Sequence, residues 1–144
     1  MFIGEYEHNL DEKNRISLPK AFRGSFGKKF VMTRGLDNCL FAYPRAAWEK
    51  VAAKLEQLSF VNADTRGFNR FMLSGAAEVE IDGAGRILIP EHQRSFANLK
   101  KRVVFAGVSD RIEVWDADRW SSYKAKIEKD AERMAQKLSE IKAL

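Results

Sequence analysis

The chain has 144 residues, of which 45% are hydrophobic and 11% aromatic, enough for one ordinary domain or for two very small domains that share a core. Its formal charge of +5 favours contact with polyanions, nucleic acids among them. Cys39 is the only cysteine, and the two histidines have no partner at ligand spacing. An internal disulfide is therefore excluded, and neither a metal nor a cofactor is expected.

Two features of the sequence bear on its location in the cell. The longest apolar run after the N-terminus, residues 103–108, is far shorter than the roughly 20 residues that a membrane helix needs. The N-terminus lacks the basic region and apolar stretch of a secretory signal. The sequence therefore predicts a cytoplasmic protein that does not contact the membrane.

The first half of the chain alternates short strands with short helices. Residues 4–10 and 15–18 flank a tight turn and alternate in polarity, which predicts two strands. Pro19 cannot donate a backbone hydrogen bond and suits the first turn of a helix, which we expect over residues 20–26. The remaining elements of this half are expected as strands at 29–34 and 39–43, a turn at 35–38 and a helix at 48–58.

The second half repeats this order after a connector, residues 62–76, which we expect to be helical with Asn62 as its N-cap. Arg66 and Arg70 on the connector are interpreted as a solvated or inter-subunit face, with a ligand site as the alternative. The last helix, residues 117–142, is amphipathic and is expected to pack on its own domain or on a neighbouring subunit. The other elements are expected as strands at 76–81, 86–89, 102–107 and 111–115 and a short helix at 91–97.

The two halves are copies of one unit. Residues 11–19 and 82–90 align at an offset of 71, and both begin with the pattern Asp-x-x-x-Arg; the similarity then continues at an offset of 72 as far as Trp48 and Trp120. A unit of about 45 residues cannot bury its apolar face alone, so each copy is expected to pack against its twin. The expected organisation is a first half at 5–47, a helical connector at 48–75, a second half at 76–119 and a C-terminal helix at 120–144.

The two Asp-x-x-x-Arg turns form the candidate site. Asn14 in the first turn matches Gly85 in the second, and these residue types tolerate a positive φ best, so each turn is expected to contain a left-handed residue. The aspartate that opens each turn can accept backbone N–H bonds and hold the guanidinium that closes the turn. These pairs are Asp11 with Arg15 and Asp82 with Arg86.

An arginine fixed in this way can bind a phosphate or the O6 and N7 edge of guanine, with about 1–3 kcal/mol of base discrimination. Alternatively, the pair only staples the turn, and an exposed ion pair of that kind contributes about 0–1 kcal/mol. Lys13, close to Arg15, favours an anion as the partner of the first turn.

Several further stretches are distinctive when they are taken together with the turns: "MFIGEYEHNLDEKNRISLP", "GLDNCLFAYP", "DGAGRILIP" and "IEVWD" followed by Trp120. With these motifs the chain resembles the MraZ family over nearly its whole length. The resemblance implies an α+β, mainly β fold in which two AbrB-like swapped-hairpin (double-psi) half-barrels form one compact barrel with flanking helices. It also implies a ring-shaped homo-oligomer, an octamer or a dodecamer.

The resemblance further implies a transcriptional regulator, commonly a repressor, that is associated with the nucleoid and has no small-molecule substrate. Family members bind repeated short G-rich boxes in double-stranded DNA upstream of the operon for cell division and cell-wall synthesis. Carried over by position, the DNA contacts are Lys13, Arg15 and Arg86. Asn14 departs from the glycine of many relatives, and its side chain can itself reach a base or a phosphate. Because the second turn lacks such residues, we expect the first turn to be the main reader and Arg86 to add a single contact.

The sequence agrees less well with three other functions. An enzyme is disfavoured because the sequence shows no nucleophile paired with a base, no phosphate-binding glycine loop and no metal cluster. An antitoxin-like module that holds a partner protein usually has one unit and a poorly ordered tail, whereas this chain has two units and a C-terminal helix. RNA binding is disfavoured because no aromatic strand motif for stacking bases is visible, although phosphate contacts alone do not distinguish RNA from DNA.

Overall fold

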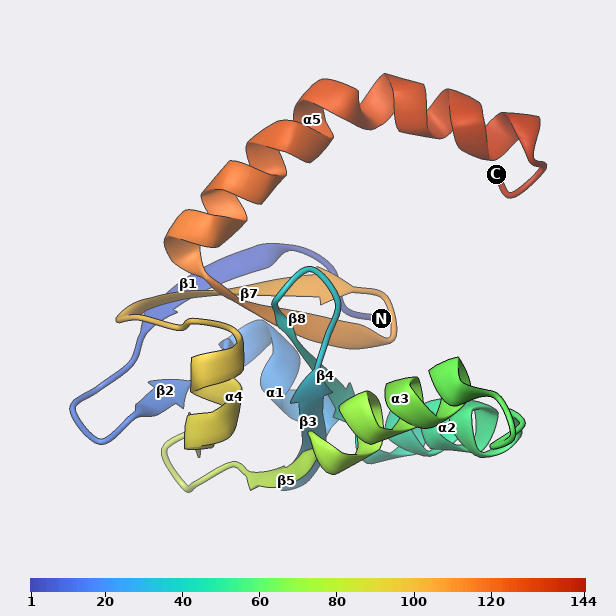
Figure 1. Cartoon of the computed structure of the whole chain (residues 1–144). Coiled ribbons are helices and arrows are strands. Elements are labelled where there is room, and N and C mark those ends of the chain that lie inside the picture. Colours follow the sequence, from blue (N-terminus) through green and yellow to red (C-terminus); the bar gives the residue numbers. More distant parts are fainter.

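The computed structural model describes all residues, 1–144 (Figure 1). Its elements in chain order are β1 (Glu5–Asn9), β2 (Arg15–Ser17), α1 (Lys20–Phe26), β3 (Lys29–Arg34), β4 (Leu40–Pro44), α2 (Arg45–Glu56), α3 (Ala63–Asn69), the π-helical turn η1 (Arg70–Ser74), β5 (Ala77–Glu80), β6 (Arg86–Leu88), α4 (Glu91–Phe96), β7 (Arg102–Val108), β8 (Arg111–Asp116) and α5 (Ala117–Glu140). Pro19 and Pro90 precede α1 and α4. The side chain of Asn62 accepts hydrogen bonds from two backbone N–H groups at the start of α3, which confirms the predicted cap.

Six strands form one antiparallel sheet in the order β1-β7-β8-β4-β3-β5. The first strand of each repeat pairs with the third strand of the other, because β1 pairs with β7 and β5 pairs with β3. The two fourth strands, β4 and β8, meet at the centre, where Leu40 lies opposite Val114. Each repeat therefore completes its sheet only with strands of the other repeat, as expected for copies that pack against each other.

The second strands, β2 and β6, form a separate two-stranded ribbon. Ile16 lies opposite Ile87 at the centre of this ribbon, and both side chains are buried. Leu18 and Ile89, one step further along the chain on the same side, are also buried. The ribbon is thus anchored by its inner face, and each of its strands begins at the arginine of an Asp-x-x-x-Arg turn.

The expectation of one compact β-barrel is wrong. β1 and β5 are the free edges of the six-stranded sheet. The strands of the ribbon are three residues long and pair with each other, so no ladder connects β1 to β5 and closes the sheet. The expectation of a mainly β protein is also wrong, because helices account for about 42% of the residues and strands for 28%.

The register of the two repeats along β3 and β7 differs from the one expected from the sequence. Phe30 lies opposite Pro44, and Val103 lies opposite Asp116. Pro44 and Asp116 are themselves equivalent, since each is the N-cap of the helix that follows. Phe30 therefore corresponds to Val103, an offset of 73 in place of 72, because the second repeat has a longer connection between its short helix and the strand that follows.

Two apolar clusters cover the two faces of the six-stranded sheet. The larger cluster contains residues of both repeats, including Ile16, Ile87 and Phe105, and lies between the sheet and the ribbon. The smaller cluster lies on the other face, around Tyr43 and Trp115, where α2, η1 and the start of α5 cover the sheet. Because the larger cluster is shared, the position of the ribbon depends on both repeats.

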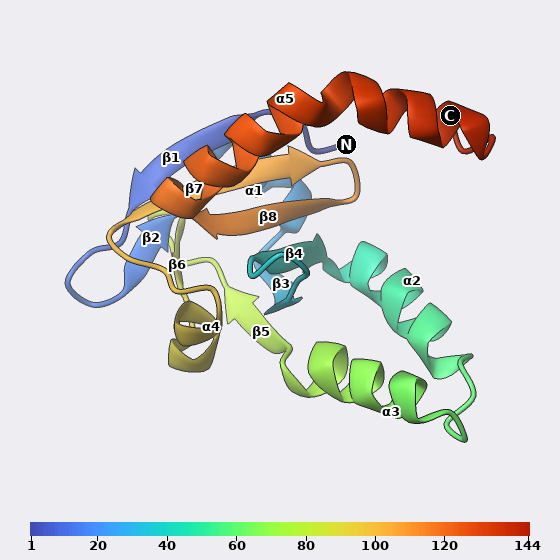
Figure 2. The same cartoon turned by 45° about the horizontal axis from the view of Figure 1, so that its top comes forward.

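Helix α5 leaves the sheet after β8 and projects away from the body of the protein (Figures 1 and 2). Trp120 and Tyr123 on its first turns pack on the smaller cluster, and the Tyr123 ring stacks on Trp115 with centroids 5.1 Å apart. Further along, Leu138 is 42% and Ile141 67% exposed. Packing on its own domain is therefore confined to the start of α5. None of the helices has the combination of length and hydrophobicity that crossing a membrane requires.

Candidate nucleic-acid interface

The first Asp-x-x-x-Arg turn is held together by its aspartate. Asp11 Oδ1 accepts hydrogen bonds from the backbone N–H groups of Lys13 and Arg15 at 2.8 and 2.9 Å, and Asp11 Oδ2 accepts one from Arg15 Nε at 3.0 Å. A backbone bond from Asn14 N–H to Asp11 O closes the turn at 3.0 Å. Asn14 has a φ of 61°, which confirms the predicted left-handed residue.

The second turn repeats this arrangement. Asp82 Oδ1 accepts hydrogen bonds from the backbone N–H groups of Ala84 and Arg86, each at 2.9 Å, and Asp82 Oδ2 accepts one from Arg86 Nε at 3.0 Å. Gly85 N–H donates to Asp82 O at 2.9 Å, and Gly85 has a φ of 78°. Two turns of different sequence thus hold their arginines in the same way.

These contacts lower the pKa of both carboxyl groups. The backbone N–H of Arg15 is the main cause of the low pKa of Asp11, and the N–H of Lys13 and the Arg15 guanidinium add to it. The N–H and guanidinium of Arg86 act in the same way on the pKa of Asp82. Both aspartates are therefore ionised at neutral pH and hold their arginines as charge-assisted hydrogen-bond partners.

The two arginines keep part of their hydrogen-bonding capacity free. Each uses Nε on its aspartate, and neither Nη group of Arg15 or Arg86 makes a hydrogen bond within the chain. Their side chains are 32% and 37% exposed. A guanidinium has five N–H donors in a fork, so an arginine in this position can staple its turn and still present its two terminal nitrogens to a ligand.

Both arginines lie on the outer face of the ribbon. Successive side chains of a strand point to opposite faces, and the ribbon pairs Arg15 with Leu88 and Ser17 with Arg86. These four residues therefore share the face opposite the buried isoleucines. Figure 1 shows the two turns on the same side of the molecule: the first is the loop between β1 and β2, and the second is the loop that follows β5. The major groove of B-DNA is wide enough to admit a two-stranded β-ribbon.

Sequence reasoning missed two residues of this face. Leu88 is 58% exposed although it is apolar, and Ser17 is half-buried. The alternation of the strand could have identified both, because each stands two residues after an arginine of the motif. An exposed leucine between two arginines offers an apolar contact to a base, such as the methyl group of thymine.

The two remaining residues that the sequence predicted as DNA contacts, Lys13 and Asn14, both lie at the first turn. Lys13 is exposed and forms no ion pair within the chain, and Asn14 is half-buried. Asn14 lines an open cleft of about 420 Å³ between this turn and the loop that precedes β7. The loop contributes Lys100 and Lys101 to the cleft, and α4 contributes Arg94. Sequence reasoning did not select these three cations.

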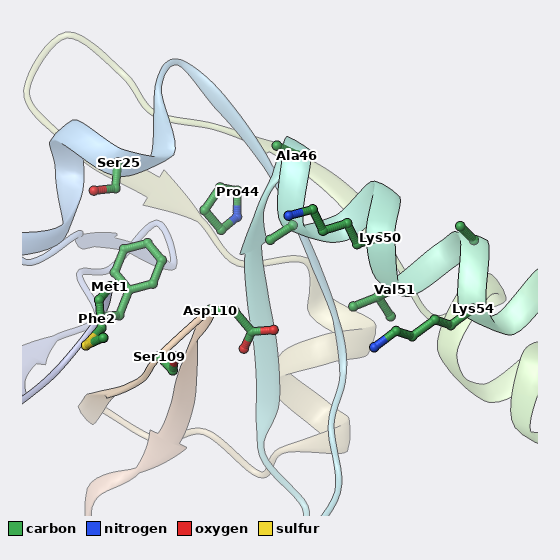
Figure 3. A pocket seen from close by; sticks show the side chains of 12 residues that line it. Met1, Phe2, Ser25, Pro44, Ala46, Lys50, Val51, Lys54, Ser109 and Asp110 are labelled. Atoms are coloured by element: carbon green, nitrogen blue, oxygen red, sulfur yellow. The ribbon is translucent and has the colours of Figure 1, made fainter.

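The largest cavity, of about 710 Å³, lies elsewhere, between the N-terminus and α2 (Figure 3). Its lining is mostly apolar, and its charged side chains are Lys50, Lys54 and Asp110. Cys39 lies outside it and is fully buried, and burial raises the pKa of its thiol, which disfavours the nucleophilic thiolate. No group of three or more histidine, cysteine, aspartate or glutamate side chains is placed to hold a metal ion.

Comparison with known proteins identifies the repeat. The family model for the MraZ protein, described as antitoxin-like, matches the chain twice, at residues 1–71 and 72–140. The chain is 50% identical to the transcriptional regulator MraZ of Acetivibrio thermocellus over 139 residues, which cover 96% of this chain and 97% of that protein. It is 45% identical to the transcriptional regulator MraZ of Desulforamulus reducens over 141 residues, which cover 98% and 99% of the two chains.

A third relative, the transcriptional regulator MraZ of Heliobacterium modesticaldum, is 48% identical over 138 residues, 96% of each chain. The chain therefore belongs to the MraZ family of transcriptional regulators. Membership confirms the resemblance found in the sequence and the expectation that the protein is a regulator and not an enzyme.

Proposed function

We propose that the protein binds double-stranded promoter DNA in a sequence-specific manner and represses the operon for cell division and cell-wall synthesis, including its own promoter. The observation that carries the proposal is the outer face of the β2–β6 ribbon, on which Arg15 and Arg86 are each held by an aspartate. Inserted into the major groove, the free nitrogens of each arginine pair with O6 and N7 of a guanine. The resulting preference is for G-rich boxes.

The two turns contribute unequally in this proposal. Lys13 adds a flexible cation beside Arg15, and the side chain of Asn14 adds a hydrogen-bonding group at the edge of the cleft. The second turn has Ala84 and Gly85 at these positions. The first turn therefore makes the larger share of contacts, and Arg86 adds one anchoring contact.

The proposal includes a ring of identical subunits, an octamer or a dodecamer, located on the nucleoid in the cytoplasm. Exposed apolar side chains support self-association: Leu138 lies on α5, Ile141 directly follows α5, and Phe60 and Val61 lie beyond α2. A ring presents many ribbons at regular intervals, so weak contacts to repeated boxes add through a high effective concentration. A single subunit then binds weakly.

The test is a footprint of the protein on the DNA upstream of its own gene. We expect protection of repeated G-rich boxes by the unaltered protein and none by the Arg15→Ala/Arg86→Ala variant, whose ring should persist in light scattering. Arg133→Ala is the matched control, because Arg133 pairs with Asp130 on the exposed part of α5, away from both turns. Protection that survives the double substitution would refute the proposed role of the turns.

A further inference from the structure

Each turn is framed on both sides by the backbone of the opposite repeat. Leu10, which precedes the first turn, donates its N–H to the carbonyl oxygen of Lys101 at 2.8 Å. Asn14, inside the turn, accepts a hydrogen bond from the N–H of Ile89 at 3.4 Å. Both partners belong to the second repeat, so the first turn is held by residues that are far away in the sequence.

The second turn is framed in the same way by the first repeat. Ile81 donates its N–H to the carbonyl oxygen of Lys28 at 2.9 Å, and Gly85 accepts a hydrogen bond from the N–H of Leu18 at 2.9 Å. Lys28 and Lys101 are equivalent at the structural offset of 73. A lysine of the opposite repeat therefore stands at the entrance of each turn.

An arginine of the opposite repeat stands at the other side of each turn. Arg94 Nη1 donates to the carbonyl oxygen of Ile89, the residue that binds Asn14. Arg23 Nε donates to the carbonyl oxygen of Leu18 at 2.8 Å, and Leu18 is the residue that binds Gly85. Arg23 and Arg94 occupy equivalent positions of α1 and α4. Each is bound to the backbone but keeps N–H donors free.

We infer that these four cations bind the DNA phosphates on either side of the bases that the turns read, an inference that rests on the proposed function. They are Lys101 and Arg94 at the first turn and Lys28 and Arg23 at the second. The chemical group recognised is the phosphodiester of the DNA backbone. The site at each turn is then composite: one repeat provides the arginine that reads the base, and the other provides the cations that hold the backbone.

The charges around the turns support this assignment. None of the four cations forms an ion pair within the chain, so the charge of each is available to an anion. In the cleft at the first turn, Lys100 adds a third cation, and the acidic residues are Asp11 and Glu12. Asp11 is neutralised by Arg15. The cleft therefore has excess positive charge and is open to an anion.

The test measures how salt weakens binding to the footprinted promoter duplex and to a scrambled duplex of the same length. The variants are Lys28→Gln and Lys101→Gln, separately and together. Both side chains are exposed, and the backbone bonds that frame the turns remain. Removing one phosphate interaction should reduce the slope of log K against log salt concentration by about 0.9 for every subunit engaged. Preference for the promoter duplex should not change, because phosphate contacts carry no sequence information.

The control is Lys126→Gln/Lys129→Gln, which removes the same charge from the exposed surface of α5 and should keep the unaltered slope. If Lys28→Gln/Lys101→Gln keeps that slope too, the inference is overturned, even where the unaltered protein prefers its promoter. If the slope falls but the unaltered protein shows no preference for the promoter, the phosphate contacts stand and the sequence-specific function fails. If the unaltered protein binds neither duplex, both are overturned.

Discussion

The two turns are built alike but differ in what surrounds them. Corresponding hydrogen bonds that the carboxylates of Asp11 and Asp82 accept have lengths within 0.1 Å of each other. At the second turn, however, Arg23 lies so close to Gly85 that a Cβ on the glycine would be 2.4 Å from Arg23 Cζ. At the first turn, Asn14 borders an open cleft. After duplication, both turns therefore kept the aspartate that holds the arginine. The residues between the aspartate and the arginine, whose side chains do not hold the arginine, have changed.

The largest expected effect is on stability, and it tests whether both turns depend on the same ribbon. Ile16→Ala and Ile87→Ala each remove a fully buried side chain from the pair at the centre of the ribbon, and each should lower the free energy of unfolding by about 2–5 kcal/mol. Urea denaturation followed by circular dichroism measures both. Leu88→Ala, on the outer face of the same ribbon, is the control and should change stability by no more than about 0.5 kcal/mol. A large difference between the two isoleucines would contradict the equivalence of the repeats.

The next effect separates the turns by DNA binding. Removing one bidentate interaction with guanine costs about 1–3 kcal/mol of discrimination, and we expect Arg15→Ala to approach the upper end and Arg86→Ala the lower. Fluorescence anisotropy with the promoter duplex at fixed salt gives both values. Lys13→Ala should reduce the salt slope by about 0.9 if Lys13 contacts a phosphate. Equal effects of the two arginine substitutions would show that the turns read DNA equally.

A third effect concerns the left-handed residues. Gly85→Ala places a Cβ at a φ of 78° and against the guanidinium of Arg23, and should destabilise the protein by about 1–2 kcal/mol from the backbone conformation alone. A further destabilisation is expected because Arg23 has to move away from the Cβ and loses its hydrogen bond to Leu18. Asn14→Gly should cost little, because glycine adopts this φ readily. Combining Gly85→Ala with Arg23→Ala in a double-mutant cycle removes the overlap but not the backbone cost. An additive cycle would mean that Arg23 does not confine the second turn.

The smallest effect is a pH dependence that the two turns should share. The pKa of Asp11 and of Asp82 is lower in the folded protein than its ordinary value of 3.8. Each aspartate therefore stabilises the fold above its unfolded-state pKa, and this stabilisation is lost as the pH falls through the lower folded-state pKa. Below about pH 4, Asp11→Asn and Asp82→Asn should show a shallower acid loss of stability than the unaltered protein. The free energy of unfolding measured over this pH range should depend less on pH in both variants, and to a similar extent. A change in only one variant would contradict the similarity of the two turns.

Much of this arrangement could be predicted from the sequence, because the signals are local. The alternation of polar and apolar residues predicted the strands, and the matched Asn14 and Gly85 predicted the left-handed residues. The open sheet could not be predicted in the same way, since the partner of an edge strand is decided by chain geometry over many residues. The contacts of Arg23 and Arg94 depend on the exchange of strands between the repeats, in which the first strand of each repeat pairs with the third strand of the other. The sequence alignment also placed β3 and β7 at an offset of 72, one residue less than the offset in the structure.

The exchange of strands also determines the order in which the protein can fold. Glu7 on β1 and Arg102 on β7 are 95 positions apart and form an ion pair, so β1 leaves the ribosome long before its partner. Contacts this distant in sequence slow folding because the intervening chain loses entropy before the contact forms. β3 acquires β4 first and β5 later, while β1 stays an unpaired edge until nearly the whole chain has been synthesised. The first strand of this regulator therefore remains without its partner strand through most of synthesis, and its short length and two glutamates disfavour pairing with other chains in that interval.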